Sequence, residues 1–491
     1  MVHRSSNPRT PESWARMAPV VALLAVTGAA MASPPCRDRF LSPFGPESLW
    51  NVAIGSAAQF VPANIYAEPA MEGSGTPLPQ TVGSSAGPSK AQCANMTAHP
   101  AQRHTCPGAF SGITPAQCAA KGCCFSDIHC SGSCPWCFTP TQQFGPRSFH
   151  NDADHFVHVK ATDPEVTWYM QGGWGPAPPG GRCAKQPGTL PFTQTTIRLP
   201  NFVKELNNAT ANCNNALSML QPDNRTVIQT QPALRCDPGG PMFSLTNGTG
   251  PNGVGGPQTY PLSVDITSSL NVGVNSSLNT ALGAHGGSGL SALGGVIRLH
   301  EVAPADGAPI AHALKLELFA HQYYYGGGSG PKKHKLQPVT ESNGGRTQYV
   351  WPATGSDGYT WNAASRLVYA GTNEYLAPGA LLALPEAVAA SLIPKLNTAP
   401  AKRVAAAFRD YGGYIIDDTA SDSASLSWES GADDVFQSAY NMSLNTADGP
   451  WYDDLVKIFQ GLSIVVNNKP DSVGGGGTPR RSPLAPLCDA V

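Results

Sequence analysis

The sequence predicts a mainly β protein, in which a β-sandwich or jelly-roll-like large domain with a few helices accompanies a small disulfide-rich module. The 491 residues contain 52 glycines and 46 prolines, and only 13% are charged, which favours short strands and tight turns over long helical bundles. Between residues 150 and 380, alternating apolar and polar stretches follow one another without the helices that a parallel α/β fold needs. Eight of the 13 cysteines lie between Cys93 and Cys137, a span too short to bury a large core.

The large domain, at about residues 150–470, contains a series of expected strands. The clearest is 313–319, where three leucines alternate with Lys315 and Glu317. This pattern predicts a strand with one buried face and one solvent-facing face. The other segments with strand-like alternation are 155–160, 166–170, 225–231 and 295–302.

Helical signals are confined to the C-terminal third of the chain. Val404, Phe408 and Tyr411 share one face of the segment 401–411, and two glycines follow it, which predicts a helix that ends there. A strand at 414–417, a second helix at 451–459 and a last strand at 462–466 complete the expected domain.

The first 32 residues have the pattern of a cleavable secretory signal. Three arginines precede an apolar run from Ala18 to Ala32, which ends in the small-x-small sequence Ala30-Met31-Ala32. Six N-x-[ST] sequons and the many cysteines also favour an extracellular glycoprotein. The sequons are at Asn95, Asn208, Asn224, Asn247, Asn275 and Asn441.

Charge and hydropathy exclude several classes of partner. The net charge is −2, which argues against binding to nucleic acid or to anionic lipid. No later run is apolar enough to span a membrane, so we expect no membrane association after signal cleavage. No metal-ligand motif with a recognisable spacing and no phosphate-binding loop is present, and we expect neither a metal nor a cofactor.

The segments around the cysteine module suggest how it joins the rest of the chain. Residues 33–73 contain Ser48–Ile54, an expected strand of the large domain, and 74–90 form a Gly/Ser/Pro-rich linker. The module, at 91–140, is then either inserted near the start of the large domain or preceded by an extended lead-in. The Gly/Pro/Arg-rich residues 471–491 are expected to be a disordered tail.

The cysteine module resembles the trefoil (P-type) domain family. The resemblance rests on Arg103 before Cys106, on Ile113-Thr114-Pro115 before Cys118, on the doublet Cys123-Cys124 and on Pro135-Trp136-Cys137-Phe138. It implies the pairs Cys93–Cys124, Cys106–Cys123 and Cys118–Cys137, each adding about 3 kcal/mol of stability. Two further cysteines, Cys130 and Cys134, are interpreted as a fourth, local bridge.

The resemblance also implies a carbohydrate-binding role. Trp136 and Pro135 match the cleft positions of trefoil domains, which are similar to small lectins that recognise mucin-type glycans. The ring of Trp136 either stacks on a sugar or belongs to the core. Asp127 either binds sugar hydroxyls or forms a framework ion pair with Arg103.

Five cysteines lie outside the module, at Cys36, Cys183, Cys213, Cys236 and Cys488. Because five cannot all pair within the chain, the sequence predicts one free thiol or an intermolecular bridge.

The densest candidate for chemistry is the Gly-rich stretch 283–295, which contains His285. Its backbone N–H groups suit an anion or a sugar hydroxyl. Ser291 is followed by Ala292 and Leu293, so the G-x-S-x-G elbow of a serine hydrolase is absent. The alternative is a plain Gly-rich turn between strands.

A second candidate combines His312 with the segment His321-Gln322-Tyr323-Tyr324-Tyr325. A histidine, either His285 or His312, would act with Tyr323 as acid and base in β-elimination from a uronate. Arg298 or Gln322 would offset the charge of the substrate carboxylate. The same tyrosines suit a packed strand end. A glycosidase would instead need two carboxylates, and the candidates for these are Asp265, Glu301, Asp417, Asp418 and Glu429.

The large domain also resembles an uncharacterised class of secreted β-proteins. The matching pieces are Ser48-Leu-Trp-Asn, Gly287-Ser288-Gly289-Leu-Ser with Ile297-Arg298, His312-Ala-Leu, Pro352-Ala with Ser356-Asp357-Gly358, and Tyr411–Asp418. This resemblance implies fold and secretion only. Three hypotheses follow: a secreted glycoprotein that binds glycans through its trefoil module, a secreted polysaccharide lyase or glycoside hydrolase, or a structural coat or matrix protein cross-linked through its odd cysteine.

Overall fold

The fold is that of a computed structural model, which describes most of the large domain and part of the cysteine module. The described residues are 36–66, 114–120, 124–125, 137–138, 148–170, 180–191, 196–203, 215–244, 262–267, 282–326, 348–357, 360, 368–419 and 423–488. Several predicted features lie outside them: the signal segment 1–32, the linker, Asp127, Pro135 and Trp136, Cys213, and the sequons at Asn95, Asn208, Asn247 and Asn275.

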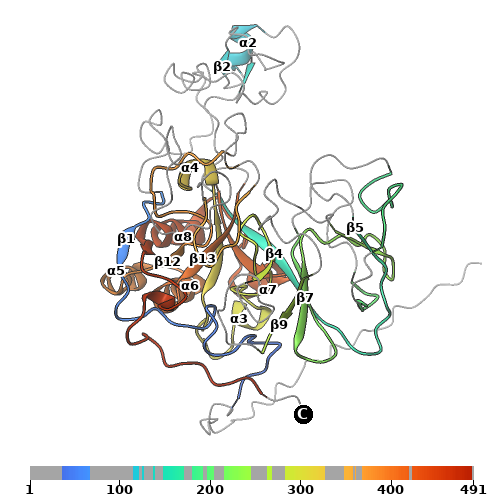
Figure 1. The fold of residues 1–491 in the computed structure, drawn as a ribbon. Coiled ribbons are helices and arrows are strands. Elements are labelled where there is room, and N and C mark those ends of the chain that lie inside the picture. The colour runs from blue at the N-terminus through green and yellow to red at the C-terminus, as the bar shows by residue number, and fades with distance from the viewer. Residues whose placement is uncertain are drawn as a thin grey trace, which may run out of the picture. The chain divides into compact units, whose positions relative to one another are not determined.

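The large domain is built on one mixed sheet of ten strands, which confirms the mainly β class (Figure 1). The strand order is β1-β15-β12-β13-β11-β14-β4-β6-β7-β9, with both parallel and antiparallel neighbours. The jelly-roll topology is not confirmed by this order. The bounds are β1 Phe60–Pro62, β4 Ser148–His158, β6 Leu217–Leu220, β7 Thr226–Thr230, β9 Leu262–Asp265, β11 Leu314–Leu318, β12 Leu381–Ala383, β13 Gly413–Asp418, β14 Ser423–Glu429 and β15 Ser463–Val465.

Helices cover one face of the centre of this sheet. Helix α6 (Ala399–Asp410) contacts α5 (Glu386–Leu392), α8 (Gly449–Gly461) and β12, and Figure 1 shows the three helices grouped beside that strand. The three leucines of β11 and Phe408 of α6 belong to the same buried core. Within the described residues of the large domain, the other helices are α3 (Leu299–Val302), α4 (Ala320–Tyr323) and α7 (Ala432–Tyr440), with 3-10 turns at Ile393–Lys395 and Val473–Gly475.

A smaller core lies beside β6 and β7. Trp168, Met219 and Met242 are buried together there. Strands β5 (Trp168–Met170) and β8 (Met242–Ser244) pair in parallel, and a disulfide joins Cys183 to Cys236. Strand β10 (Leu282–His285) contacts β7 and β9 and leads into the Gly-rich stretch.

The described part of the cysteine module agrees with the pairing that the trefoil resemblance implies. Cys118 is bonded to Cys137 and is fully buried. Helix α2 (Pro115–Ala120) is preceded by Thr114, whose hydroxyl accepts a hydrogen bond from the backbone of Gln117, as in a helix cap. Strands β2 (Cys124–Phe125) and β3 (Cys137–Phe138) form a small antiparallel pair.

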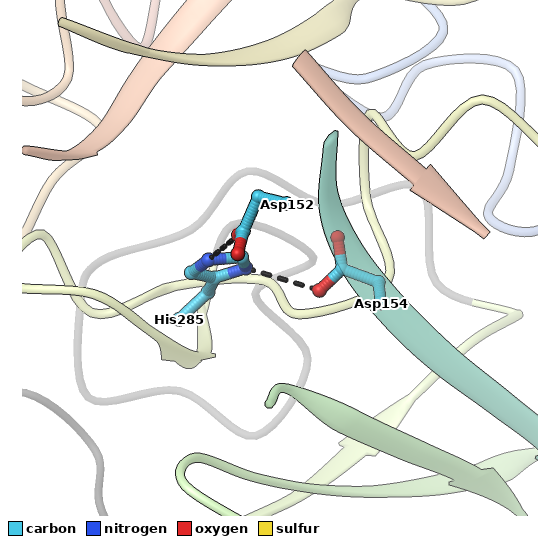
Figure 2. Close-up of side chains that lie close together, drawn as sticks. All are labelled: Asp152, Asp154 and His285. Atoms are coloured by element: carbon cyan, nitrogen blue, oxygen red, sulfur yellow. Dashed lines mark ion pairs between the residues drawn. The ribbon is translucent and has the colours of Figure 1, made fainter. Parts of the chain in front are cut away.

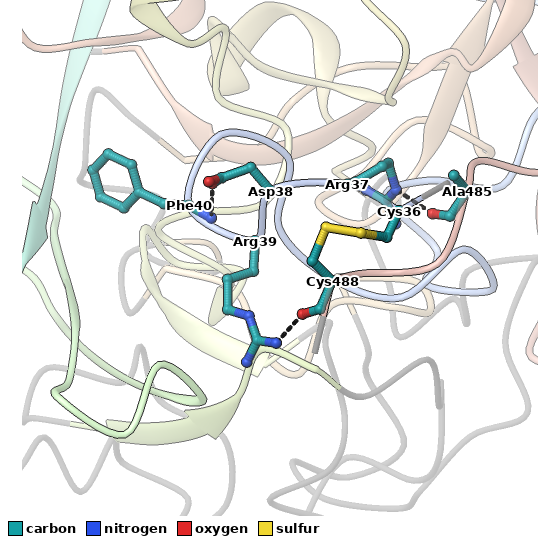
Figure 3. The surroundings of a disulfide bond; sticks show 7 residues. All are labelled: Cys36, Arg37, Asp38, Arg39, Phe40, Ala485 and Cys488. Carbon is teal, nitrogen blue, oxygen red and sulfur yellow. Dashed lines mark hydrogen bonds between the residues drawn. A yellow bond between two sulfur atoms is a disulfide. The ribbon is translucent and has the colours of Figure 1, made fainter. Parts of the chain in front are cut away.

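The two ends of the large domain are joined (Figure 3). A disulfide links Cys36 to Cys488, β1 pairs with β15, and the guanidinium of Arg39 donates a hydrogen bond to the carbonyl of Cys488. The expected disordered tail is therefore folded at least to residue 488, since its Gly/Pro-rich composition is compensated by pairing with the N-terminal segment.

Three local expectations differ from the structure. Residues 48–54 form turns rather than a strand, although Leu49, Trp50 and Ile54 are buried in a large-domain core. The segment 295–302 contains helix α3 instead of a strand. Helices also occur before the C-terminal third, in α3 and α4. In the part of the chain that the structure describes, no helix combines the length and the apolar character that crossing a membrane requires.

Candidate functional site

The candidate site is built on the polar face of β11. Lys315 and Glu317 are two residues apart, so both side chains leave the sheet on the face opposite the leucines. The sequence predicted that this face meets solvent, and that prediction is wrong. Lys315 is 0% exposed and Glu317 4% exposed, because the Gly-rich stretch after β10 lies over them.

Strand β14 lies between β11 and β4 in the sheet, and its short side chains leave room for the longer side chains of these two neighbours. Its register places Ser425 opposite Glu317 on β11, and Ser427 opposite Asp152 on β4. Because these serine side chains are short, the longer side chains of β11 can reach across β14 to the acidic residues of β4. Asp417 of β13, beside Glu317 in the other direction, extends the group of carboxylates.

His285, the last residue of β10, lies at the centre of these groups (Figure 2). Its Nε2 is 2.7 Å from Oδ2 of Asp152 and 3.4 Å from Oε1 of Glu317. Its Nδ1 is 3.2 Å from Oδ1 of Asp154. Figure 2 shows Asp152 and Asp154 pointing at the two sides of the imidazole. The ring is fully buried, so both nitrogens interact with protein groups.

Lys315 completes the site. Its Nζ lies 2.8 Å from Nδ1 of His285 and 2.9 Å from Oδ2 of Asp154, and it donates to the carbonyl of Ala292 at 3.1 Å. A hydrogen bond between two nitrogens needs a lone pair on one of them. The Lys315–His285 pair therefore carries one positive charge rather than two, and the Nε2 of His285 keeps its proton toward Asp152 and Glu317.

Glycines make this close packing possible. Gly286 has a φ of +61°, and a Cβ there would lie 2.3 Å from Cγ of Asp417. Its backbone N–H donates to Oε1 of Gln231, and that of Gly287 donates to Oδ1 of Asp417 at 3.2 Å. Gly294 lies against the Trp50 ring, where a Cβ would be 2.2 Å from Cε2. The N-terminal segment thus supports the turn that carries His285.

The carboxyl groups of the site differ in their affinity for protons. Burial and the charge of Asp152 raise the pKa of Glu317 well above its ordinary value. Burial also raises the pKa of Asp152, but the charge of His285 and hydrogen bonds from His285 and Glu317 lower it on balance. Burial raises the pKa of Asp417. Glu317 therefore holds a proton where Asp152 is ionised.

Burial and the nearby Lys315 lower the pKa of His285, yet Asp154 and Asp152 outweigh them and raise it well above its ordinary value. These acidic neighbours stabilise the single positive charge that Lys315 and His285 share. Four carboxyl groups thus surround one positive charge, and protons on Glu317 and Asp417 reduce the excess of negative charge.

Three sets of side chains have the composition of metal-ligand sets among the described residues: Asp152, Asp154 and His285; His285, Glu317 and Asp417; and Asp357, Asp417 and Asp418. The two sets that contain His285 do not fit a cation. Lys315 occupies Nδ1, and the proton that remains on Nε2 blocks the other nitrogen. The third set offers only carboxylate oxygens, the ligands that Ca²⁺ and Mg²⁺ prefer.

The four residues proposed for elimination chemistry do not converge. Arg298 is buried, with Nε 2.8 Å from Oε2 of Glu429. His312 pairs with Glu301 at 3.0 Å, and Glu301 also accepts the backbone N–H of Arg298. Tyr323, 6% exposed, lies in the buried core that also contains the leucines of β11 and Phe408 of α6. Only His285 is at the candidate site.

The other predicted residues are distributed over the domain. Of the carboxylate candidates, Asp417 lies at the site, with Asp418 next to it in β13. Asp265 forms an ion pair with Arg225. The sequon residue Asn441 is exposed at the end of α7, whereas Asn224 is half-buried and hydrogen-bonded to His158.

Sequence reasoning missed Asp152, Asp154, Lys315 and Glu317 as members of the site. The alternation of β11 contained a signal, since a lysine and a glutamate share one face of a strand between leucines. Nothing local indicated that a distant Gly-rich turn covers that face.

Comparison with known proteins identifies one part of the chain. No solved structure matches this chain. A family model, described as Trefoil (P-type) domain, matches residues 93–140. The cysteine-rich module of this protein belongs to the trefoil (P-type) family.

Proposed function

We propose that this protein is a secreted glycoside hydrolase that holds its glycan substrate through the trefoil domain. The observation that carries the proposal is the position of Glu317 and Asp152, two acidic side chains brought together beside His285 on a covered sheet face. Two carboxyl groups whose environments favour opposite protonation states can supply the acid and the base of a hydrolysis, and Asp152, which is 15% exposed, is the member of the pair nearest to solvent.

The proposed reaction uses the proton of Glu317 and the charge of Asp152. When substrate binds, Glu317 exchanges its hydrogen bond to Asp152 for one to the glycosidic oxygen, and it donates its proton there as the C–O bond breaks. Asp152 accepts a proton from the water whose oxygen forms the new bond to the anomeric carbon. His285, whose Nε2 faces both carboxyl groups, positions them and stabilises the charge on Asp152.

Hydrolysis fits the site better than elimination from a uronate. Elimination needs a cation to offset the substrate carboxylate, and Arg298 was the candidate for that role. Arg298 instead pairs with Glu429 and lies over the rings of Phe40 and Phe156, at 5.2 and 4.5 Å from their centroids. The described cation at His285 is Lys315, which contacts Asp154.

The trefoil domain supplies the link to carbohydrate. Trefoil domains are compatible with glycan binding, and Trp136 and Pro135 match the cleft positions of the family. A module that holds a polymer raises the local concentration of scissile bonds at a tethered catalytic domain. The disulfides and the signal-like N-terminus support an extracellular location for both.

The test is a degradation assay with the purified secreted protein on a panel of polysaccharides. New reducing ends without ultraviolet absorbance from unsaturated products are expected, together with loss of cleavage in Glu317→Gln. The matched control is Asp265→Asn, which removes a carboxylate from a surface ion pair far along the sheet. Unsaturated products would show elimination and contradict the proposal.

The trefoil role has a separate readout. Trp136→Ala is expected to reduce retention on insoluble polysaccharide, with hydrolysis of short soluble substrates unchanged. Retention without cleavage of any substrate would leave a carbohydrate-binding protein. Absence of both, with a thiol-sensitive ladder on gels, would favour the structural coat or matrix hypothesis.

A further inference from the structure

Lys315 and Asp154 form an ion pair with an unusual environment. Nζ of Lys315 is 2.9 Å from Oδ2 of Asp154, and the two side chains are 0% and 3% exposed. A buried ion pair gains little stability because both charges lose their hydration. A buried lysine also readily becomes a neutral, nucleophilic amine.

A proton acceptor lies beside both groups. Nδ1 of His285 is 2.8 Å from Nζ of Lys315 and 3.2 Å from Oδ1 of Asp154. One ring nitrogen can therefore take a proton from the amine and deliver it to the carboxyl oxygen. The carbonyl of Ala292 accepts a further hydrogen bond from Nζ at 3.1 Å and fixes the direction of the amine.

We propose that Lys315 and Asp154 condense to form an intramolecular isopeptide bond, with His285 as the proton shuttle. This inference goes beyond the proposed hydrolysis and does not depend on it. The arrangement combines a buried nucleophile, a carboxyl group held beside it and a positioned base, which are the requirements for an efficient intramolecular acyl transfer.

The reaction balances without another reactant. The ammonium of Lys315 gives one proton to Nδ1 of His285, and the neutral amine attacks Cγ of Asp154 to form the C–N bond. The tetrahedral nitrogen then loses a second proton. Both protons reach Oδ1, the C–O bond breaks, and one water molecule leaves. An ammonium and a carboxylate thus become a neutral secondary amide, with no change in oxidation state.

The product suits the site better than the reactants. The amide removes two charges from a buried position while its N–H can still donate to Nδ1 of His285, so the Nε2 proton stays toward Asp152 and Glu317. The bond would join β11 to β4 across β14, the strand that separates them in the sheet. A covalent link across three strands fixes the floor of the candidate site.

The chain contains a matched control pair. Lys457 Nζ is 3.3 Å from Oδ1 of Asp454, but the Lys457 side chain is 41% exposed. The partners that surround this carboxylate are hydroxyl, amide and backbone N–H groups of Asn397 and Thr398, without an imidazole. Lacking both the burial of the amine and the base, this pair is expected to remain ionic.

Peptide mass mapping of the full-length secreted protein tests the proposal. After reduction, deglycosylation and trypsin digestion, residues 148–160 and 299–332 are expected as one branched species, lighter than the two peptides together by one water molecule. Cleavage after Lys315 should be absent, whereas cleavage after Lys457 should be complete. Fragment ions across the branch separate the cross-link from dehydration elsewhere, such as at an Asp-Gly or Asn-Gly sequence.

Two variants complete the experiment. Lys315→Arg keeps a cation against Asp154 but lacks the amine, and it should give separate peptides. His285→Gln should leave Lys315 open to trypsin. Recovery of 148–160 and 299–315 as unlinked peptides from the wild-type protein would overturn the proposal, whatever the variants show and whether or not the protein hydrolyses glycans.

Discussion

Nζ of Lys315 and Nδ1 of His285 lie 2.8 Å apart on the covered face of the sheet, so these two basic residues share one positive charge. That relationship sets the protonation of the whole site. It leaves the Nε2 proton of His285 toward Asp152 and Glu317, and it leaves four carboxyl groups with one positive charge between them. Some of these carboxyl groups must hold protons, and Glu317 is the one whose surroundings favour this most.

The stability of Glu317→Gln relative to the wild type should therefore depend on pH. Burial raises the pKa of Glu317 above its unfolded value, so its contribution to stability is complete below the unfolded pKa and is lost as pH rises through the folded pKa. A glutamine keeps the neutral form at every pH. As pH rises from about 4, the melting temperature of the variant should increase relative to that of the wild type. Circular dichroism measures both melting temperatures. A constant difference would show that folding leaves the pKa of Glu317 unshifted and would contradict the assignment.

The hydrolytic rate should follow a bell-shaped pH profile. Activity should fall at low pH as Asp152 is protonated, through a pKa that lies below its ordinary value. It should fall at high pH as Glu317 loses its proton, through a pKa well above its ordinary value. Asp152→Asn and Glu317→Gln should each lower kcat by roughly 10²–10⁴-fold and remove one limb. If both limbs of the pH profile persist in both variants, then groups other than Asp152 and Glu317 carry out the chemistry.

The sequence predicted the strands and helices at the centre of the large domain better than it predicted which segments of the chain cover them. The Leu-Lys-Leu-Glu-Leu pattern correctly predicted β11 and which residues share a face, because both follow from local periodicity. It predicted the wrong environment for Lys315 and Glu317, because the cover comes from the Gly-rich turn at 283–295 and from Trp50, far away in the chain. Burial of this kind depends on tertiary contacts that no local pattern records.

The same contrast between local pattern and tertiary contacts explains which site residues the sequence indicated. His285 was found because a histidine among glycines is conspicuous, and Asp417 because an acidic pair ends an apolar strand. Asp152 and Asp154 were missed because the alternation was read only from His155 onward, although β4 begins at Ser148. Arg298 and His312 were chosen for their chemistry, yet Glu429 and Glu301 bind them in structural ion pairs.

Arg298→Lys should therefore affect stability and leave catalysis intact. The guanidinium pairs with Glu429, donates to the carbonyl of Phe40 and lies over two aromatic rings, and a lysine cannot make these contacts together. A loss of about 2 kcal/mol is expected from urea unfolding. Arg225→Lys, in a pair whose arginine side chain is 62% exposed, is the control and should destabilise the protein less than Arg298→Lys does, because solvent screens the pair. A large fall in kcat of correctly folded Arg298→Lys would place this residue in the reaction after all.

The two described disulfides of the large domain should differ in their contribution to stability. Cys36–Cys488 closes a sequence separation of 452 residues, and Cys183–Cys236 one of 53. Loop-closure entropy then predicts losses of about 6 and about 4 kcal/mol when each bridge is replaced by serines. The longer loop matters more because it restricts more of the unfolded ensemble. Urea unfolding of Cys36→Ser/Cys488→Ser against Cys183→Ser/Cys236→Ser measures the difference. A smaller loss for the longer loop would mean that contacts such as β1 with β15 hold the chain ends together even in the unfolded state.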